Sequence, residues 1–345
     1  MSNDTNKTDL ELNKNSKTSN EEAVFSKKPL ADRTTNKTLR KLCLQWQDHV
    51  MVLPGIIFLI IFSYVPIYGI VTAFKDFEVH LGFFNSPWAV NAAGELDLFK
   101  YFKMFAGDAI FWKSIKNTLI INLLGLIISF PAPIIFSLFL VEIPSKVFRK
   151  SVQMVSYMPY FISWIVFGGL VIKILDPYTG ALGQILVKLN VIGEGYYLLS
   201  HPEYVYSITI ISALIKDLGW GSIIYLAALT SVSSELIEAA DIEGATRLQK
   251  MRYISLPTIM GTVSIYLIFR ISGMLGSNFD QMYILKNNTN KSTAEVIDTY
   301  VYYMGIEVMD LPYSTAVGLA RSLVSFLLLL VANFASKKIS GKGLY

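Results

Sequence analysis

The sequence predicts an all-α membrane protein with six transmembrane helices. Of its 345 residues, 53% are hydrophobic and 16% are charged, whereas an ordinary soluble domain carries about 25% charged residues. Six apolar runs are each long enough to cross a hydrocarbon core, which takes about 20 helical residues. The mean hydropathy of the whole chain is +0.46. Lipid is therefore expected to cover the apolar surface that a single globular core cannot hide.

Residues 1–45 precede the first apolar run and are rich in Asn, Lys, Thr, Ser and Glu. Such a composition buries too little apolar surface to offset the entropy of ordering. It also lacks the apolar segment and small-residue cleavage site of a secretory signal. We therefore predict a disordered cytoplasmic tail over residues 1–45 and a membrane domain over residues 46–345.

Six predicted spans follow the tail. They are residues 51–74, 115–141, 152–175, 204–229, 256–279 and 313–334. The second contains Pro131 and Pro133, and prolines inside an apolar helix predict a kink or a break into two half-helices. Charged residues within the later spans are unfavourable in lipid and are expected to face protein, water or an interface. They are Lys216, Asp217, Arg270 and Arg321.

The distribution of Lys and Arg predicts the orientation of the chain. Residues 1–50, the loops 142–151 and 230–255 and the residues after 336 together hold 18 of these residues. The alternate loops, counted over residues 75–111, 176–203 and 280–310, hold six. Cytoplasmic segments carry the excess of positive charge. Both termini are therefore expected in the cytoplasm, in agreement with an even number of spans.

Several chemistries are excluded by residue content. Cys43 is the only cysteine, so an intramolecular disulfide framework and a cysteine-based zinc or iron-sulfur site are ruled out. The three histidines have no zincin spacing, and no phosphate-binding GxxxxGK[ST] sequence occurs. We therefore expect no metal site, and any ATP must be bound by another subunit.

The loop of residues 230–257, between the fourth and fifth spans, predicts two short helices. A pair of serines is suited to cap the first, and Glu235 in its first turn favours the helix dipole. Gly244 suits the left-handed conformation that ends a helix. A basic stretch follows, and Pro257 suits the first turn of the fifth span. A rigid acidic and then basic segment between membrane helices suits docking, although a solvated loop would be charged as well.

This loop resembles the EAA motif of ABC importer permeases, which reads Glu-Ala-Ala, three residues, Gly, nine residues, Ile, one residue and Leu-Pro. Every position is matched, by Glu238, Ala239, Ala240, Gly244, Ile254, Leu256 and Pro257. The resemblance implies a cytoplasmic coupling helix that docks in a groove of a separate ATPase subunit and transmits its closure to the membrane helices. The alanines would allow close approach, and the glutamate would pair with a basic residue there.

The chain after the tail resembles the carbohydrate permeases related to the maltose system, in particular their six-span, polysaccharide-type (LplB-like) branch. Matching stretches include Leu53-Pro54-Gly55, Tyr157-Met158-Pro159-Tyr160, Gly219-Trp220-Gly221-Ser222 and Tyr313-Ser314-Thr315-Ala316. The resemblance implies a type I ABC importer transmembrane domain.

In the maltose-like permeases the sugar site lies near the middle of the membrane, on the spans before and after the coupling loop. Aromatic faces hold the CH groups of sugars, and a few polar groups fix their orientation. The implied substrate path comprises Tyr160, Trp164, Gly219, Trp220, Ser222, Arg270, Gly273, Ser277 and Asn278. For each aromatic residue the alternative is packing against lipid or at the membrane interface.

The implied function is that of a permease subunit of an ATP-driven ABC importer for oligosaccharides, in a bacterial plasma membrane. The chain would hold no catalytic residue and no cofactor, because partner ATPase subunits would bind ATP and Mg²⁺. Expected partners are a second homologous permease, an ATPase dimer, an extracytoplasmic solute-binding protein (a lipoprotein in some bacteria), the oligosaccharide and membrane lipid. No nucleic acid is expected.

Two other classes of protein remain as alternatives. An ion-coupled secondary transporter would need a titratable group at the membrane midplane, and Asp217 is the candidate, unless it only forms an internal ion pair with Lys216. An intramembrane enzyme would need paired carboxylates, a Ser and His arrangement or a metal cluster within the spans, and the sequence offers none of these.

Overall fold

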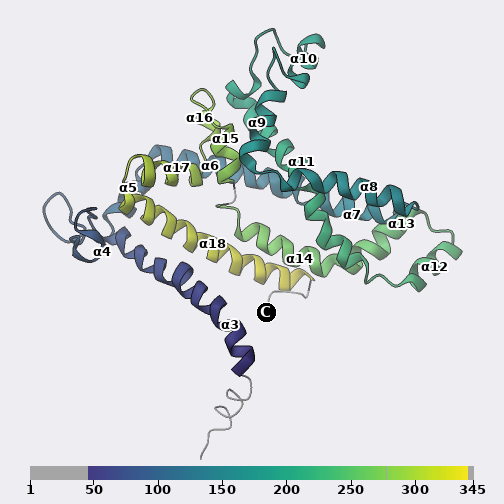
Figure 1. Ribbon diagram of the computed structural model, residues 1–345, viewed down its shortest axis with the longest axis horizontal. Helices are drawn as coiled ribbons and strands as arrows, with labels where there is room; N and C mark the ends of the chain where they lie inside the picture. The colour runs from purple at the N-terminus through teal and green to yellow at the C-terminus, as the bar shows by residue number, and fades with distance from the viewer. Residues whose placement is uncertain (1–45, 277, 341–345) are drawn as a thin grey trace, which may run out of the picture. The chain divides into compact units, whose positions relative to one another are not determined.

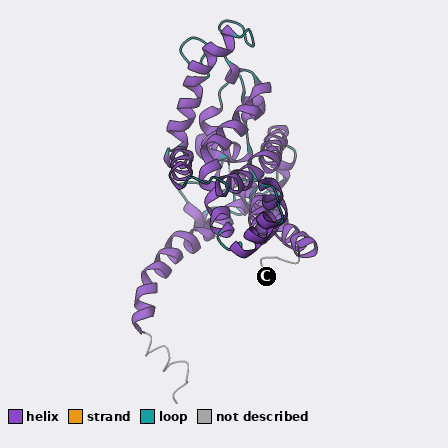
Figure 2. Ribbon diagram, turned by 90° about the vertical axis from the view of Figure 1, so that its right-hand side faces the viewer, coloured by secondary structure: helices purple, strands orange, loops and turns teal. Residues whose placement is uncertain are grey.

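The computed structural model describes residues 46–276 and 278–340 of the chain. Within these residues the secondary structure is helical, with no strand and two isolated antiparallel bridges, Lys75 with Trp88 and Val90 with Leu96. Figure 2 shows the helices and the loops that join them. The predicted all-α fold is confirmed, and the predicted tail of residues 1–45 lies outside the described part.

The chain divides into two compact units, residues 1–68 and 69–345. The described part of the first unit is helix α3 (Trp46–Leu59), followed by a π-helical turn at Ile60–Tyr64 and the start of a 3₁₀ helix at Val65–Phe74. The apolar helix Val50–Phe74 is long enough to span a membrane, and its most apolar stretch has no buried residue. Because a helix satisfies its own backbone groups, such a segment can face lipid.

The second unit contains the remaining helices, which Figure 1 labels. They are α4 (Gly82–Asn85), α5 (Lys100–Ala106), α6 (Ala109–Leu124), α7 (Pro131–Val141), α8 (Lys146–Tyr157), α9 (Trp164–Ile174), α10 (Ala181–Lys188), α11 (Pro202–Leu229), α12 (Ser234–Ile242), α13 (Arg247–Lys250), α14 (Leu256–Ser272), α15 (Phe279–Leu285), α16 (Lys291–Ala294), α17 (Ile297–Tyr302) and α18 (Leu311–Ser340).

Helices α6 and α7 form one span, Ala109–Val141. A π-helical turn at Gly125–Ser129 joins them, and Pro131 is the first residue of α7. Of the two predicted alternatives, a kink or a break into two half-helices, the break is wrong, because the helix continues through the π-helical turn.

The third span is not the continuous helix predicted over residues 152–175. It is interrupted between the segments Lys146–Phe161 and Trp164–Ile174, whose axes differ by 102°. Ile162 and Ser163 are extended at the break, and the Ser163 hydroxyl caps α9 by accepting a hydrogen bond from the Val166 N–H at 3.4 Å.

The remaining spans are Pro202–Leu229, Arg247–Ser272 and Leu311–Lys338. The predicted fifth span of residues 256–279 is therefore misplaced: the helix starts earlier, because α13 and α14 are joined by a π-helical turn at Met251–Ser255, and ends where Gly273 stops it. Within the described residues five helices are long and apolar enough to cross a membrane, or six if the bent pair is one span.

Three buried clusters hold the second unit together. One joins α5, α6, α17 and α18 around Phe111 and Val317. Another joins α7, α11 and α14 through Ile134, Tyr225 and Ile259. The third joins α6 and α11 to α15 and α16, with Met282 fully buried. Helix α11 takes part in two of the three clusters and is the central element around which the polar sites lie.

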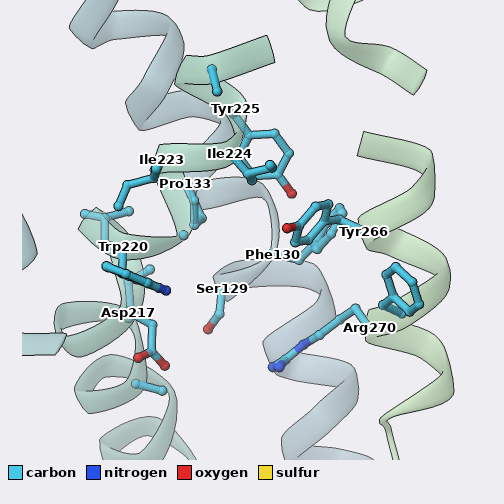
Figure 3. Close-up of a pocket in the computed structure, with 16 residues that line it drawn as sticks. Ser129, Phe130, Pro133, Asp217, Trp220, Ile223, Ile224, Tyr225, Tyr266 and Arg270 are labelled. Atoms are coloured by element: carbon cyan, nitrogen blue, oxygen red, sulfur yellow. The ribbon is translucent and has the colours of Figure 1, made fainter. Parts of the chain in front are cut away.

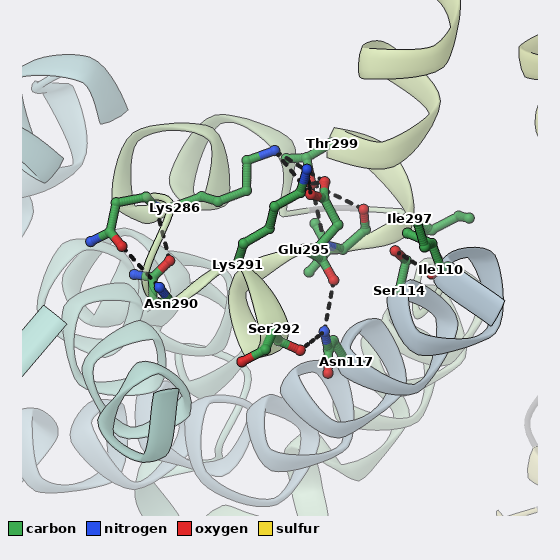
Figure 4. A network of polar contacts seen from close by, with 12 residues as sticks. Ile110, Ser114, Asn117, Lys286, Asn290, Lys291, Ser292, Glu295, Ile297 and Thr299 are labelled. Carbon is green, nitrogen blue, oxygen red and sulfur yellow. Dashed lines mark hydrogen bonds and ion pairs between the residues drawn. The ribbon is translucent and has the colours of Figure 1, made fainter. Parts of the chain in front are cut away.

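The segment that connects α15 to α17 is attached to α6 by a network of polar contacts (Figure 4). Lys286 Nζ donates to both carboxylate oxygens of Glu295, at 3.0 and 3.3 Å, and Lys291 approaches the same group at 3.8 Å. The Thr299 hydroxyl donates to Glu295 Oε1 at 2.8 Å, and Asn117 of α6 donates to the Glu295 carbonyl at 2.9 Å. The connection is thereby held by side chains rather than by apolar packing alone.

Candidate functional site

The loop of residues 230–257 is built around α12, an exposed helix between α11 and α13. Gly244 follows the helix with φ +80°, so the predicted left-handed turn is confirmed. The Ala245 N–H then donates to the Ala240 carbonyl at 2.9 Å, which closes the helix end. The predicted serine cap is wrong for Ser233, whose side chain makes no capping hydrogen bond.

The basic stretch after Gly244 is the beginning of the fifth span rather than a separate helix. Thr246 and Gln249 form a capping box at its start. From there the helix runs through Arg247–Ser272. Lys250 Nζ donates to Asp241 Oδ1 at 2.6 Å and so links this helix to the end of α12. The loop is thus mechanically connected to α14.

The surface of α12 and of the start of the fifth span, which holds Leu248 and Tyr253, combines apolar and acidic side chains. Ile242 is 88% exposed, and Leu236, Leu248 and Tyr253 are also more than half exposed. Glu238 is exposed and pairs with no described residue. Large apolar side chains at this exposure indicate a protein-protein contact when they gather in one place. A rigid helix carrying them is suited to dock against another subunit.

A cavity of about 590 Å³ lies between α7, α11 and α14. In Figure 3, Asp217 and Trp220 project from α11 on one side and Arg270 projects from α14 on the other. Its other lining residues are mainly apolar or aromatic: Ser129, Phe130, Pro133, Ala213, Leu214, Leu218, Gly221, Ile223, Ile224, Tyr225, Ala227, Tyr266 and Phe269. The cavity therefore offers aromatic faces together with one carboxylate and one guanidinium.

The guanidinium of Arg270 lies against the backbone of Gly125 in the π-helical turn. A Cβ atom added at Gly125 would lie 2.9 Å from Arg270 Nη2. Trp220 is 42% exposed in the isolated chain, and the Asp217 side chain is exposed as well. The cavity is thus open on the side of α11 that these residues share.

The structure separates the predicted path residues into groups. Trp220 and Arg270 line the cavity. Tyr160 stacks on Trp220, with ring centroids 4.4 Å apart and planes 4° apart. Trp164 instead lines a different cavity, of about 300 Å³, beside α15.

Other predicted path residues do not line the large cavity. At Gly219 an added Cβ would lie 2.1 Å from the Ser156 carbonyl oxygen, so this glycine allows α8 and α11 to approach closely. Ser222 is fully buried, and its hydroxyl donates to the Gly219 carbonyl at 2.6 Å. Gly273 ends α14 and Asn278 precedes α15. Ser277 lies outside the described residues.

Sequence reasoning missed the contribution of the second span to the cavity. Ser129, Phe130 and Pro133 come from the turn and the first part of α7. The proline-rich sequence was a signal for an irregular helix but not for its neighbours. Tyr266 was accessible to prediction, because it precedes Arg270 by four residues and so shares its helix face.

Membrane-spanning helices that line an aromatic and charged cavity, with an exposed helix between two spans, are typical of a component of a membrane transporter. The chain belongs to the family of binding-protein-dependent transport system inner membrane components, whose model matches residues 121–341. It is therefore a multi-pass permease subunit of an ABC importer, as its sequence predicts.

Curated relatives and solved structures extend the similarity over most of the chain. Protein LplB of Bacillus subtilis is 36% identical over 297 residues, which cover 86% of this chain and 90% of the relative. The polygalacturonan/rhamnogalacturonan transport system permease protein YteP of the same bacterium is 36% identical over 324 residues, 94% of this chain and 97% of the relative.

Two crystal structures of a bacterial ABC transporter for the acidic polysaccharide alginate contain a similar chain. In one, the match is 34% identical with a TM-score of 0.79, and it covers 88% of this chain and 99% of the other. The second structure is in complex with an alginate pentasaccharide-bound periplasmic protein. There the identity is 33%, the TM-score is 0.79, and the match covers 90% of this chain and 100% of the other.

Proposed function

We propose that this permease subunit carries oligosaccharides across a bacterial plasma membrane, through the cavity between α7, α11 and α14. The observation that carries the proposal is the combination of Trp220, Tyr266 and the Asp217 and Arg270 charges around one cavity of about 590 Å³. Aromatic rings pack against the CH faces of sugars, and a few charged or polar groups orient the hydroxyls.

We further propose that the preferred oligosaccharides carry carboxylates. Arg270 supplies a guanidinium whose paired donors match a carboxylate, and this side chain makes no hydrogen bond or ion pair within the described residues. Asp217 on the opposite wall would accept hydrogen bonds from sugar hydroxyls. Relatives are named for polygalacturonan and alginate transport, and both of these are acidic polysaccharides.

The open side of the cavity supports a second permease as the other half of the path. Partners proposed for the whole transporter are that permease, a pair of ATPase subunits that bind ATP and Mg²⁺, and a solute-binding protein. The solved alginate transporter in complex with its sugar-bound periplasmic protein supports the last of these. The chain itself is proposed to hold neither a catalytic residue nor a cofactor.

Helix α12 is the proposed contact with the ATPase, with both termini of the chain in the cytoplasm. Ala239 and Ala240 would allow close approach to a groove, and the exposed Glu238 would pair with a basic residue in it. The loop with the matching EAA residues supports this assignment. The 18 Lys and Arg residues on the segments of the same side support the orientation.

The test is ATP-dependent uptake by the complete transporter in proteoliposomes. Trigalacturonate and an alginate pentasaccharide serve as acidic probes, and maltotriose serves as a neutral one. We expect uptake of an acidic probe that requires ATP, with uptake by Arg270→Met at least tenfold lower. Uptake that persists without ATP and stops with a protonophore would instead favour the ion-coupled alternative, with Asp217 as the coupling group.

The docking assignment is tested by reversing one charge. Glu238→Lys should reduce the ATPase subunit that copurifies and the ATP hydrolysis stimulated by the binding protein, because a like-charge contact in a closed interface opposes association. Glu194→Lys is the matched control, since Glu194 is exposed on a loop far from α12 in sequence. Normal stoichiometry and normal stimulation in Glu238→Lys would refute this role of α12.

A further inference from the structure

The break in the third span leaves backbone carbonyls without helical partners. A continuous helix would use the Pro159 and Tyr160 carbonyls to accept hydrogen bonds from residues four positions later. Here the only backbone donor to the Pro159 carbonyl among the described residues is the Ile162 N–H, three positions later, at 3.2 Å. At the break Ile162 is extended with ψ 132°, and the following segment turns away by 102°. In the middle of a membrane, carbonyl groups freed in this way need another donor.

Lys216 of α11 supplies that donor. Its side chain is buried, with 4% of its surface exposed. The ammonium donates to the Tyr160 carbonyl at 2.9 Å, to the Pro159 carbonyl at 3.2 Å, and also to the Ile162 carbonyl. A lysine has three N–H donors, so these contacts use all of them. The predicted ion pair with Asp217 is therefore not formed.

Aromatic rings surround the same ammonium group. Lys216 Nζ lies 5.5 Å from the ring centroids of Tyr160 and Trp164, and 5.7 Å from that of Phe167. All three rings belong to the broken span, on both sides of the break. A cation held among aromatic faces away from water is stabilised by their quadrupoles. The lysine therefore contacts both the backbone and the side chains of the bent segment.

The same face of α11 contacts the residues at the break a second time, one helical turn after Lys216. Trp220 follows Lys216 by four residues and stacks on Tyr160, the residue whose carbonyl and ring Lys216 also contacts. Between them Gly219 lets the Ser156 carbonyl approach α11 closely. Trp220 lines the large cavity, whereas Tyr160 is not among its lining residues. Tyr160 thus supports Trp220 from outside the cavity.

We propose that Lys216 is a positioning residue of the transport path: it holds the break in the third span, and through Tyr160 it fixes the Trp220 ring on the cavity wall. Loss of its donors leaves the Tyr160 and Ile162 carbonyls without a hydrogen-bond donor and weakens the bonding of the Pro159 carbonyl, which keeps only the Ile162 N–H. The lowest-energy response is to straighten the break into a continuous helix. Tyr160 then rotates away from Trp220. The role of the wall in transport rests on the proposed function, whereas the geometry of the break does not.

The experiment measures the bend directly in the assembled transporter in nanodiscs. Cys43 is replaced by Ser, and spin labels are placed at Val147 on α8 and Ile172 on α9, which are both exposed. We expect a narrow distance distribution in the parent protein. In Lys216→Met the distribution should broaden and shift to longer distances, by on the order of 10 Å if the helices straighten. Lys216→Gln, which keeps some donors, should give a smaller shift.

Two further measurements separate this role from general destabilisation. Lys173→Met, at an exposed lysine of the same span, should leave the distance unchanged. Uptake of trigalacturonate by Lys216→Met should fall at least tenfold, and by Lys216→Gln less. Distances in Lys216→Met and Lys216→Gln identical to those of the parent would overturn the proposal. A shifted distance in Lys216→Met, together with no oligosaccharide uptake by the parent transporter, would uphold the role of Lys216 in the break and refute only the proposed function.

Discussion

At the scale of single residues, Asp108 shows how one carboxylate can join three helices. It precedes α6 and accepts a hydrogen bond from the Ile110 N–H at 2.7 Å. The Tyr300 hydroxyl of α17 donates to Asp108 Oδ2, and the Tyr313 hydroxyl of α18 donates to the same oxygen at 3.0 Å. Burial raises the pKa of Asp108, but the hydrogen bonds from Tyr300, Ile110 and Tyr313 together hold its pKa below the usual range.

We expect Asp108 to stabilise the fold in a pH-dependent way. Because its pKa is lower in the folded state, the stabilisation is present above the unfolded carboxyl range, about pH 4, and is lost as the pH falls through the folded pKa. At pH 7, Asp108→Asn should lose about 2 kcal/mol, the order of a hydrogen bond to a charged group. Thermal unfolding in detergent checks this at pH 7 and near pH 3.

The difference in melting temperature between the parent and Asp108→Asn should be larger at pH 7 than near pH 3, where part of the stabilisation is lost. Asp280→Asn is the control, because this aspartate is exposed in the first turn of a short helix. An equal difference at both pH values would contradict the assigned charge state of Asp108.

Individual residues illustrate which features of the site can be predicted from the amino-acid sequence and which cannot. Gly244 was predictable because a left-handed glycine ends helices. The capping Ser163 and the nearby Pro159 were available as signals of a break in the third span. The target of Lys216 was not predictable, because its carbonyl partners lie on another helix and backbone acceptors leave no trace in residue type.

At the scale of elements, the connection between α15 and α17 depends on a buried charge. The Glu295 side chain is 6% exposed, and Lys286 is 21% exposed. Removing one partner of a buried ion pair leaves the other uncompensated. The Asn117 side chain also bonds the carbonyls of Ser292 and Glu295, so the network connects this segment to α6.

We therefore expect Glu295→Ala to destabilise the folded protein by about 3 kcal/mol, in the range for a broken buried pair. Limited proteolysis should then cut between residues 286 and 299 at protease concentrations that leave the parent intact. Glu307→Ala, at an exposed glutamate nearby, should behave like the parent. Equal protease resistance of the two variants would show that apolar packing alone holds the connection.

The sequence predicted that the membrane-spanning helices exist. It did not predict where each helix begins and ends, or which helices pack against one another. The apolar runs located every span, because about 20 apolar residues are a strong signal. The fifth span was placed several residues too late, since Gly273 was not used as its end and the basic stretch after Gly244 was not joined to it. The cavity needed the packing of α7 against α11 and α14, and helical periodicity gives a face without naming its partner.

At the scale of the whole molecule, the bent pair decides the topology. If Lys146–Phe161 and Trp164–Ile174 together cross the membrane once, there are six crossings; if they enter and leave on one side, there are five. Six crossings place both termini on one side, and five place them on opposite sides. The distribution of Lys and Arg favours six.

The expected result is a cytoplasmic location for both ends of the chain. Single cysteines at Ser2 and at Gly343, in a Cys43→Ser background, should react with a membrane-impermeant thiol reagent only after the cells are opened. A cysteine at Glu194, on the loop after the bent pair, should react in intact cells. Labelling of the C-terminal cysteine in intact cells would instead show that the bent pair re-enters on one side.

The unbroken run from the capped Thr246 turn through Arg247–Ser272 makes the fifth span a lever. Its 26 residues correspond to about 39 Å of helix. One end carries the Lys250 contact to α12, and the other carries Arg270 at the cavity. A tilt of about 10° around the middle of such a rod displaces each end by about 3 Å in opposite directions. A small displacement of α12 would then move the Arg270 guanidinium by about a hydrogen-bond length. A force applied to α12 would in this way make or break a hydrogen bond of Arg270 in the cavity.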